Sequence, residues 1–160
     1  MPIDVQALLE PSRAAFLMME CQEGIIGGGA VANCLVLAAG RKGTPLLPGS
    51  PQQAVVAPLA PADGDYVVTR FHGVTPFHGT ELDSLLRNVG VRTVVATGVS
   101  ANVGILGLTI EAVNAGYQVV IPREAVTGAP DEYVDAVFEH TLRLLATITT
   151  VGRVTEAWTR

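Results

Sequence analysis

Five short apolar runs, each about the length of a β-strand, alternate with segments of helical pattern along this chain. The runs cover residues 14–19, 66–69, 93–97, 117–121 and 146–150. Near-continuous apolar runs of this kind are typical of a parallel sheet whose strands are buried on both faces. The alternation therefore predicts a three-layer α/β/α fold with a mostly parallel sheet, formed by a single domain over residues 1–160.

Helix signals lie between these runs. Thr80 with Asp83 approximates a capping box, and residues 101–115 have a helical period. Pro130 is expected in the first turn of a further helix, where its missing N–H costs nothing. The buried stripe of that helix would comprise Val134, Val137, Phe138, Thr141, Leu142 and Leu145.

The interval from Gly27 to Asp65 does not fit this alternation. It contains a helical stretch over residues 30–39, followed by prolines within residues 44–51 that exclude a central strand. Either the sheet is one strand short, or part of the native chain is absent from the sequence.

Charge and composition exclude several classes of partner. A net charge of −5 argues against a nucleic-acid partner, and a single lysine, Lys42, argues against a polybasic membrane patch. The first ten residues lack the basic region of a signal peptide, and no apolar run is long enough to span a bilayer. Cys21 and Cys34 form no metal-ligand or redox spacing. We therefore expect a cytoplasmic protein with free thiols, without a metal or other cofactor.

Two charged residues follow the first two apolar runs. Ligands of open parallel sheets bind outside the carboxyl ends of the strands, so Glu20 and Arg70 are candidate site residues at the ends of adjacent strands. A carboxyl group among apolar side chains can act as an acid or a base, and a guanidinium can anchor an anion. The structural alternatives, a cap for Glu20 and an ion pair for Arg70, stay open.

The third candidate is the turn that follows the third apolar run. Its backbone N–H groups are suited to cradle a carbonyl oxygen or an anion. Ser100 in this turn is better explained as a helix cap than as a nucleophile, because the sequence places no histidine to activate it.

Three motifs of the isochorismatase-like hydrolases, the superfamily that includes nicotinamidases and other cysteine amidohydrolases, resemble segments of this chain. In chain order the segments are residues 16–22, residues 68–70 followed by 76–82, and residues 97–104. The family has aspartate, lysine and, in most members, a nucleophilic cysteine where this chain has Glu20, Arg70 and Gly104. Glycine has no side chain, so a covalent thioester cannot form at position 104. The resemblance also implies a cis peptide bond between Val99 and Ser100.

Isochorismatases proper also have glycine at the cysteine position and cleave a vinyl ether by acid catalysis. The resemblance therefore implies a hydrolase for a small, carboxylate-bearing molecule, with Glu20 as the acid and Arg70 as the anchor. A backbone cradle would be formed by Val99, Ser100, Val103 and Gly104, and substrate contacts are expected from Gln22, Phe77, His78 and Asn102.

Three changes at the catalytic positions keep an alternative open, in which an inactive member of the family binds a small molecule or acts as a scaffold. A weaker alternative makes Cys21 a reactive thiol. Members of the family commonly associate, so a homodimer or a higher homo-oligomer is expected. Trp158 is expected either to dock a short terminal helix or to lie in the subunit interface.

Overall fold

The structure is a computed structural model that describes residues 4–19, 54–70 and 74–159. The chain forms two compact units, one comprising Met1–Met19 with Val74–Arg160 and the other Glu20–Gly73. The predicted helix over residues 30–39 and the proline-rich stretch at 44–51 lie outside the described residues.

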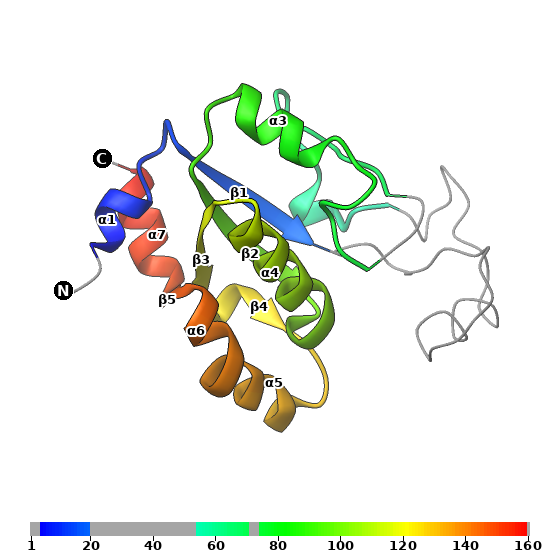
Figure 1. Cartoon of the computed structure of the whole chain (residues 1–160), viewed down its shortest axis with the longest axis vertical. Helices are drawn as coiled ribbons and strands as arrows, with labels where there is room; N and C mark the ends of the chain where they lie inside the picture. Colours follow the sequence, from blue (N-terminus) through cyan, green and yellow to red (C-terminus); the bar gives the residue numbers. More distant parts are fainter. Residues whose placement is uncertain (1–3, 20–53, 71–73, 160) are drawn as a thin grey trace. The chain divides into compact units, whose positions relative to one another are not determined.

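The first unit contains a parallel sheet of five strands (Figure 1). The strands are β1 (Ala14–Met19), β2 (Thr93–Val99), β3 (Gln118–Pro122), β4 (Val126–Thr127) and β5 (Thr147–Thr149). Their order is β1-β2-β3-β5, β4 pairs with the carboxyl end of β2, and every pairing is parallel. Four of the five predicted strands and the parallel arrangement are confirmed, whereas the two-residue strand β4 was not predicted.

Helices flank this sheet (Figure 1). The α-helices are α1 (Val5–Leu8), α3 (Leu82–Asn88), α4 (Leu106–Asn114), α5 (Asp131–Val137), α6 (Arg143–Leu145) and α7 (Val151–Trp158). The π-helical turns η3 (Ala101–Ile105) and η5 (Phe138–Leu142) precede α4 and α6, and the 3-10 turns are η2 (Ala57–Leu59) and η4 (Arg123–Ala125). None of the helices in the described ranges has both the length and the apolar character needed to cross a bilayer.

The core lies on both faces of the central strands. On one face Val95 and Val120 pack with Leu9 and with Val154 and Ala157 of α7. Successive strand residues point to opposite faces, so the equally buried Val94 and Ile121 belong to the other face. Burial on both faces is therefore confirmed for β2 and β3.

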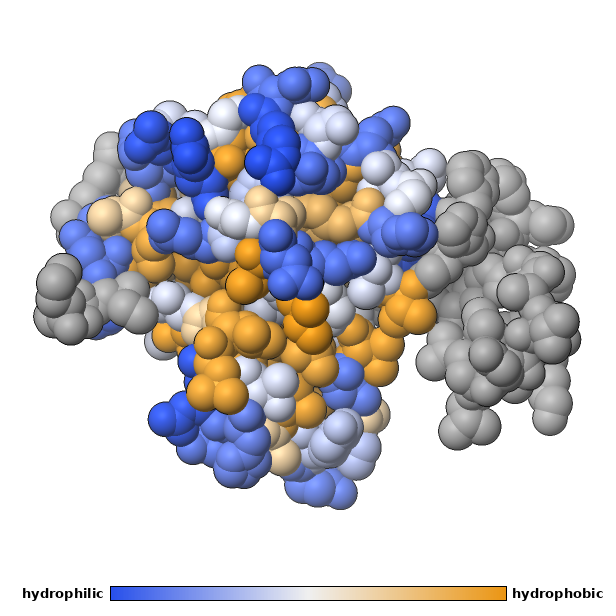
Figure 2. Space-filling model, viewed as in Figure 1, coloured by the Kyte–Doolittle hydropathy of each residue, from blue (hydrophilic) through white to orange (hydrophobic). Residues whose placement is uncertain are grey.

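Burial on both faces is wrong for β1. Phe16 and Met18, which share one face, are 48% and 38% exposed. Among the described strands β1 pairs only with β2, so it lies at the edge of the described sheet, where less of its surface is covered. Other large apolar side chains also remain at the surface, Leu144 with 78% exposure among them, and Figure 2 shows several apolar areas on the viewed face.

The predicted strand at residues 66–69 is also wrong. These residues, part of the second unit, pair with no described strand, and Tyr66 and Val67 are 69% and 62% exposed. A four-residue apolar run becomes a strand only where a neighbouring strand supplies hydrogen-bond partners, and the sequence alone does not reveal that neighbour. Arg70 therefore does not end a described strand.

Two predicted helix starts need correction. The Thr80 hydroxyl does accept a hydrogen bond from the Leu82 N–H (3.2 Å), but Asp83 takes no part in a capping box. It instead accepts hydrogen bonds from Arg87 and Tyr117. Pro130 is the N-cap of α5 rather than a residue of its first turn, and the Ala129–Pro130 bond is cis.

The stripe predicted for the helical segment from α5 to α6 is largely confirmed. Its residues Val134, Val137, Phe138 and Leu142 are buried, and Thr141 and Leu145 are half-buried.

The docking of the C-terminal helix is confirmed. The Trp158 indole N–H donates to the Leu9 carbonyl oxygen over 3.0 Å, and its ring meets Phe16 edge-on at 6.2 Å between centroids. Val154, one turn earlier, is buried. This places α7 beside α1 on one face of the sheet (Figure 1).

A polar cluster links α3 to the start of β3. The Tyr117 hydroxyl donates to Asp83 Oδ1 (2.9 Å), while Arg87 contacts the other carboxylate oxygen of Asp83 (3.0 Å) and the Ala115 carbonyl oxygen (2.8 Å). The hydrogen bonds from Arg87 and Tyr117 hold the pKa of Asp83 below its usual 3.8. A carboxylate with a lowered pKa stabilises the fold above that usual value, and the stabilisation is lost as the pH falls through the lowered pKa.

We expect Tyr117→Phe to lower the free energy of unfolding by about 1 kcal/mol at neutral pH, because one hydrogen bond to the carboxylate is lost. The difference from the wild type should shrink at a pH well below 3.8, where Asp83 becomes protonated. Urea unfolding at both pH values measures this, and Tyr133→Phe, which alters a half-exposed ring on α5, is the matched control. If Tyr117→Phe and the wild type differed in free energy of unfolding by the same amount at both pH values, the lost stability could not come from the hydrogen bond to the Asp83 carboxylate.

Candidate functional site

The carboxyl end of β2 leads into a turn with an unusual backbone. The Val99–Ser100 peptide bond is cis, as the family resemblance predicts. The turn continues into η3 and α4 without interruption, so the sheet and helix α4 fix its two ends.

Glycine at position 98 permits a close approach between β1 and this turn. Gly98 has a φ of +111°, and a Cβ built on it would lie 2.2 Å from the Met19 carbonyl oxygen. The register of the ladder also pairs Met19 with Gly98. The last described residue of β1 thus touches the start of the turn. Glu20 is the next residue along the chain, and both Glu20 and Gln22 lie outside the described residues.

Ser100 organises the first helical turn. Its hydroxyl accepts a hydrogen bond from the Gly104 N–H (3.5 Å), and its carbonyl oxygen accepts from the N–H groups of Val103 (3.3 Å) and Ile105 (2.9 Å). The predicted capping role is confirmed. The N–H groups of Val103 and Gly104, which we expected to form a cradle, are therefore directed at Ser100 itself.

Strand β4 and the glycine that follows it pack against the turn on the side away from β1. Val126 and Thr127 pair with Gly98 and Val99. A Cβ built on Gly128 would lie 3.2 Å from the Ala101 nitrogen and 3.5 Å from Asn102 Oδ1. The side chain of Asn102 is thus placed beside Gly128.

Phe77 and His78 lie on a segment that packs along α4. Glu111 of α4 accepts a hydrogen bond from the Phe77 N–H (3.1 Å), and the Phe77 ring lies 6.0 Å from the Tyr117 ring. Tyr117 directly precedes β3, at the end of α4 opposite to Gly104, and His78 is exposed. The structure therefore brings Ser100, Asn102, Val103 and Gly104 into one turn and places Phe77 with Tyr117.

Arg70, half-buried, belongs to the second unit. Neither of the residues that we expect to carry the chemistry, Glu20 and Arg70, is therefore positioned against the turn by the described geometry. Within the described ranges, no three His, Cys, Asp or Glu side chains converge in a way that could hold a metal ion.

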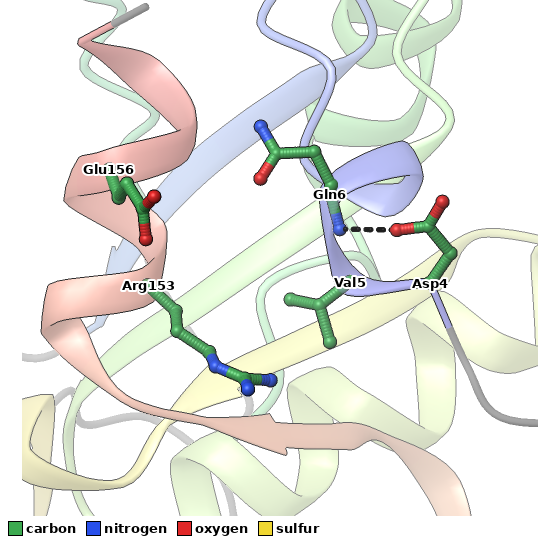
Figure 3. A pocket seen from close by; sticks show the side chains of 5 residues that line it. All are labelled: Asp4, Val5, Gln6, Arg153 and Glu156. Carbon is green, nitrogen blue, oxygen red and sulfur yellow. Dashed lines mark hydrogen bonds between the residues drawn. The ribbon is translucent and has the colours of Figure 1, made fainter.

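Two surface hollows lie away from this turn. The first, of about 300 Å³, is lined by Asp4, Val5 and Gln6 at α1 and by Arg153 and Glu156 of α7 (Figure 3). Asp4 Oδ1 accepts the Gln6 N–H there and so caps α1 (3.0 Å). The second, of about 430 Å³, is lined by Arg123, Asp135, Phe138, Glu139, Arg143 and Ile148. Of the predicted site residues that the structure describes, none lines either hollow.

Sequence reasoning missed two residues that contact the site segments. Glu111 holds the Phe77 backbone, and Gly128 abuts the turn. In the sequence alone, Glu111 looks like an ordinary polar residue of a helix and Gly128 like an ordinary loop glycine. Only the three-dimensional neighbours distinguish them.

Similarity to known proteins extends over most of the chain. The model of the isochorismatase domain matches residues 30–152. An uncharacterised isochorismatase family protein of Bacillus subtilis, YwoC, is 36% identical over 94 residues, which cover 59% of this chain and 47% of YwoC.

Solved structures of similar fold include an isochorismatase family protein from Desulfovibrio vulgaris (TM-score 0.63, 27% identity, covering 70% of this chain and 58% of that one). The N-carbamoylsarcosine amidase of Thermoplasma acidophilum also matches (TM-score 0.56, 27% identity, covering 64% of this chain and 57% of that one). The chain spans about half the length of the curated relatives that it matches, between 47% and 56%.

Proposed function

This chain belongs to the isochorismatase family, and we propose that it hydrolyses a small, carboxylate-bearing molecule by acid catalysis without a cysteine nucleophile. The fold and the similarity to an amidase support hydrolysis of a small molecule in general terms. The acid catalysis, the class of substrate and the roles of individual residues are our proposal.

The observation that carries the proposal is the residue at the end of the third motif. Gly104 is buried, has no side chain and directs its N–H toward the Ser100 hydroxyl. A thiol nucleophile cannot act from that position, and the two cysteines of the chain, Cys21 and Cys34, occur elsewhere in the sequence. Hydrolysis by this chain must then proceed without a covalent thioester at position 104.

The proposed reaction uses Glu20 as the acid. Its carboxylic acid protonates the vinyl carbon of an enol ether, and the resulting oxocarbenium ion is attacked by water. The hemiketal then collapses to an alcohol and a carbonyl compound, and the proton released restores the acid. Arg70 would anchor the substrate carboxylate, because a guanidinium stays charged and offers two parallel N–H donors.

The absence of a cysteine mechanism gives a direct test. We expect the double variant Cys21→Ser/Cys34→Ser to turn over isochorismate, the probe substrate, at the wild-type rate, because neither thiol takes part in the reaction. Product formation by the full chain is measured for both proteins, with thermal unfolding as the check on folding. A loss of turnover in a folded double variant would favour Cys21 as a reactive thiol and would contradict the proposal.

One observation favours a second candidate function, that of an inactive member of the family that binds a small molecule or acts as a scaffold. The N–H groups of Val103 and Gly104 are both engaged by Ser100. Calorimetric titration with benzoate, a non-hydrolysable carboxylate, together with the turnover assay separates the two functions. Binding without turnover of any vinyl ether tested would support the second candidate.

A further inference from the structure

Gly128 follows β4 and lies beside the first residues of η3. The short ladder between β4 and β2 pairs Val126 with Gly98 and Thr127 with Val99. The chain then reaches Gly128 directly beside Ala101 and Asn102. The backbone at Gly128 therefore supports the turn from the side of β4.

Space, and not backbone conformation, explains why a glycine stands here. The φ of Gly128 lies outside the left-handed region, so its conformation is open to any residue. A Cβ would instead lie 3.0 Å from Val134 Cγ2 and 3.2 Å from the Ala101 nitrogen. Both separations are tighter than ordinary van der Waals contact, and the second involves backbone that cannot rotate away.

We propose that Gly128 is a positioning residue for the turn of Ser100 to Gly104. A methyl group at position 128 would press on the Ala101 nitrogen and displace the turn by a few tenths of an ångström. Ser100 is the neighbour of Ala101 and holds three N–H groups of this turn, so the displacement reaches Gly104 as well. The inference rests on the proposed function only in that the turn is taken to contact the substrate.

The experiment compares Gly128→Ala with the wild type and with Gly152→Ala. The matched control adds the same methyl group in α7, where its nearest neighbour is Thr150 Oγ1 at 3.9 Å. We expect Gly128→Ala to lower kcat for isochorismate about tenfold with KM within about twofold, because small misplacements of reacting groups have large effects on rate. Gly152→Ala should keep the wild-type values.

A second variant separates positioning from packing. Adding Val134→Ala to Gly128→Ala removes the contact with Cγ2 but leaves the contact with the Ala101 nitrogen. We expect kcat to stay low in this double variant, relative to Val134→Ala alone. Recovery of kcat to the level of Val134→Ala would overturn the proposal, since the effect would then come from crowding in the core.

A readout without substrate keeps the inference distinct from the proposed function. Apart from residues 127–129, whose amides respond to the substitution directly, we expect the largest amide chemical-shift changes in Gly128→Ala at residues 101–104. Changes confined to Val134 and the rest of α5 would overturn the inference. If the wild type turns over no vinyl ether while the shifts at residues 101–104 change, the proposed function fails and the positioning role stands.

Discussion

Gly98→Ala should lower the free energy of unfolding by about 3 kcal/mol or more. Two costs add at this position: the left-handed backbone disfavours a residue with a Cβ, and the methyl group would lie 2.2 Å from the Met19 carbonyl oxygen. Because that oxygen belongs to the backbone of β1, relief requires the β1–β2 ladder to separate at its carboxyl end. Denaturant unfolding of the purified chain measures the loss.

Gly90→Ala is the control for Gly98→Ala. Gly90 also has a left-handed φ (+80°), but a Cβ there would meet nothing within 4 Å. Gly90→Ala should therefore lower the free energy of unfolding only by the cost of the left-handed backbone, about 1 kcal/mol. Equal losses in the two variants would show that the contact with Met19 contributes nothing.

Glu20→Gln should reduce the turnover of isochorismate by about 10²-fold to 10⁴-fold, the range over which a positioned acid accelerates proton transfer. Glutamine keeps the size of the side chain and cannot donate the carboxyl proton, so folding and binding should change little. Steady-state kinetics with thermal unfolding as a folding check provides the measurement. Turnover equal to that of the wild type would eliminate the role assigned to Glu20.

The control for Glu20→Gln is Glu139→Gln. Glu139 is an exposed carboxylate of η5 that pairs with Arg143. Its replacement removes one negative charge from the chain without touching the turn at Ser100, so turnover should stay at the wild-type level. A parallel loss in both variants would attribute the effect to net charge and not to a proton donor.

The alternation of apolar runs predicted the parallel sheet well, because buried strands such as β2 and β3 require continuous apolar sequence. The same rule failed for residues 66–69, where Tyr66 and Val67 are exposed and no residue pairs with a described strand. An apolar pattern shows that a segment favours the β conformation, but it does not show whether another strand lies beside that segment to pair with it. The two residues of β4 are too few to produce a pattern at all.

The candidate site was predicted in part. The cap at Ser100 follows from local chemistry, and the cis bond follows from the family resemblance; both are confirmed. The involvement of Gly128 depends on contacts between distant segments, which no local signal records. The roles of Glu20, Arg70 and Gln22, the single domain, the homo-oligomer and the cytoplasmic location stay predictions.

Helix α4 connects two of the three motifs mechanically. Gly104 lies in η3, the turn that leads directly into α4. Further along, Gly107 packs against Thr75, whose Cγ2 would lie 2.5 Å from a Cβ added at position 107. Glu111 accepts a hydrogen bond from the Phe77 N–H. A helix behaves as a stiff rod, so a slide along its axis would carry the turn and the Thr75–Phe77 segment together. Substitutions that destabilise α4 should therefore alter both motifs together, even where the substituted residue lies far from either motif.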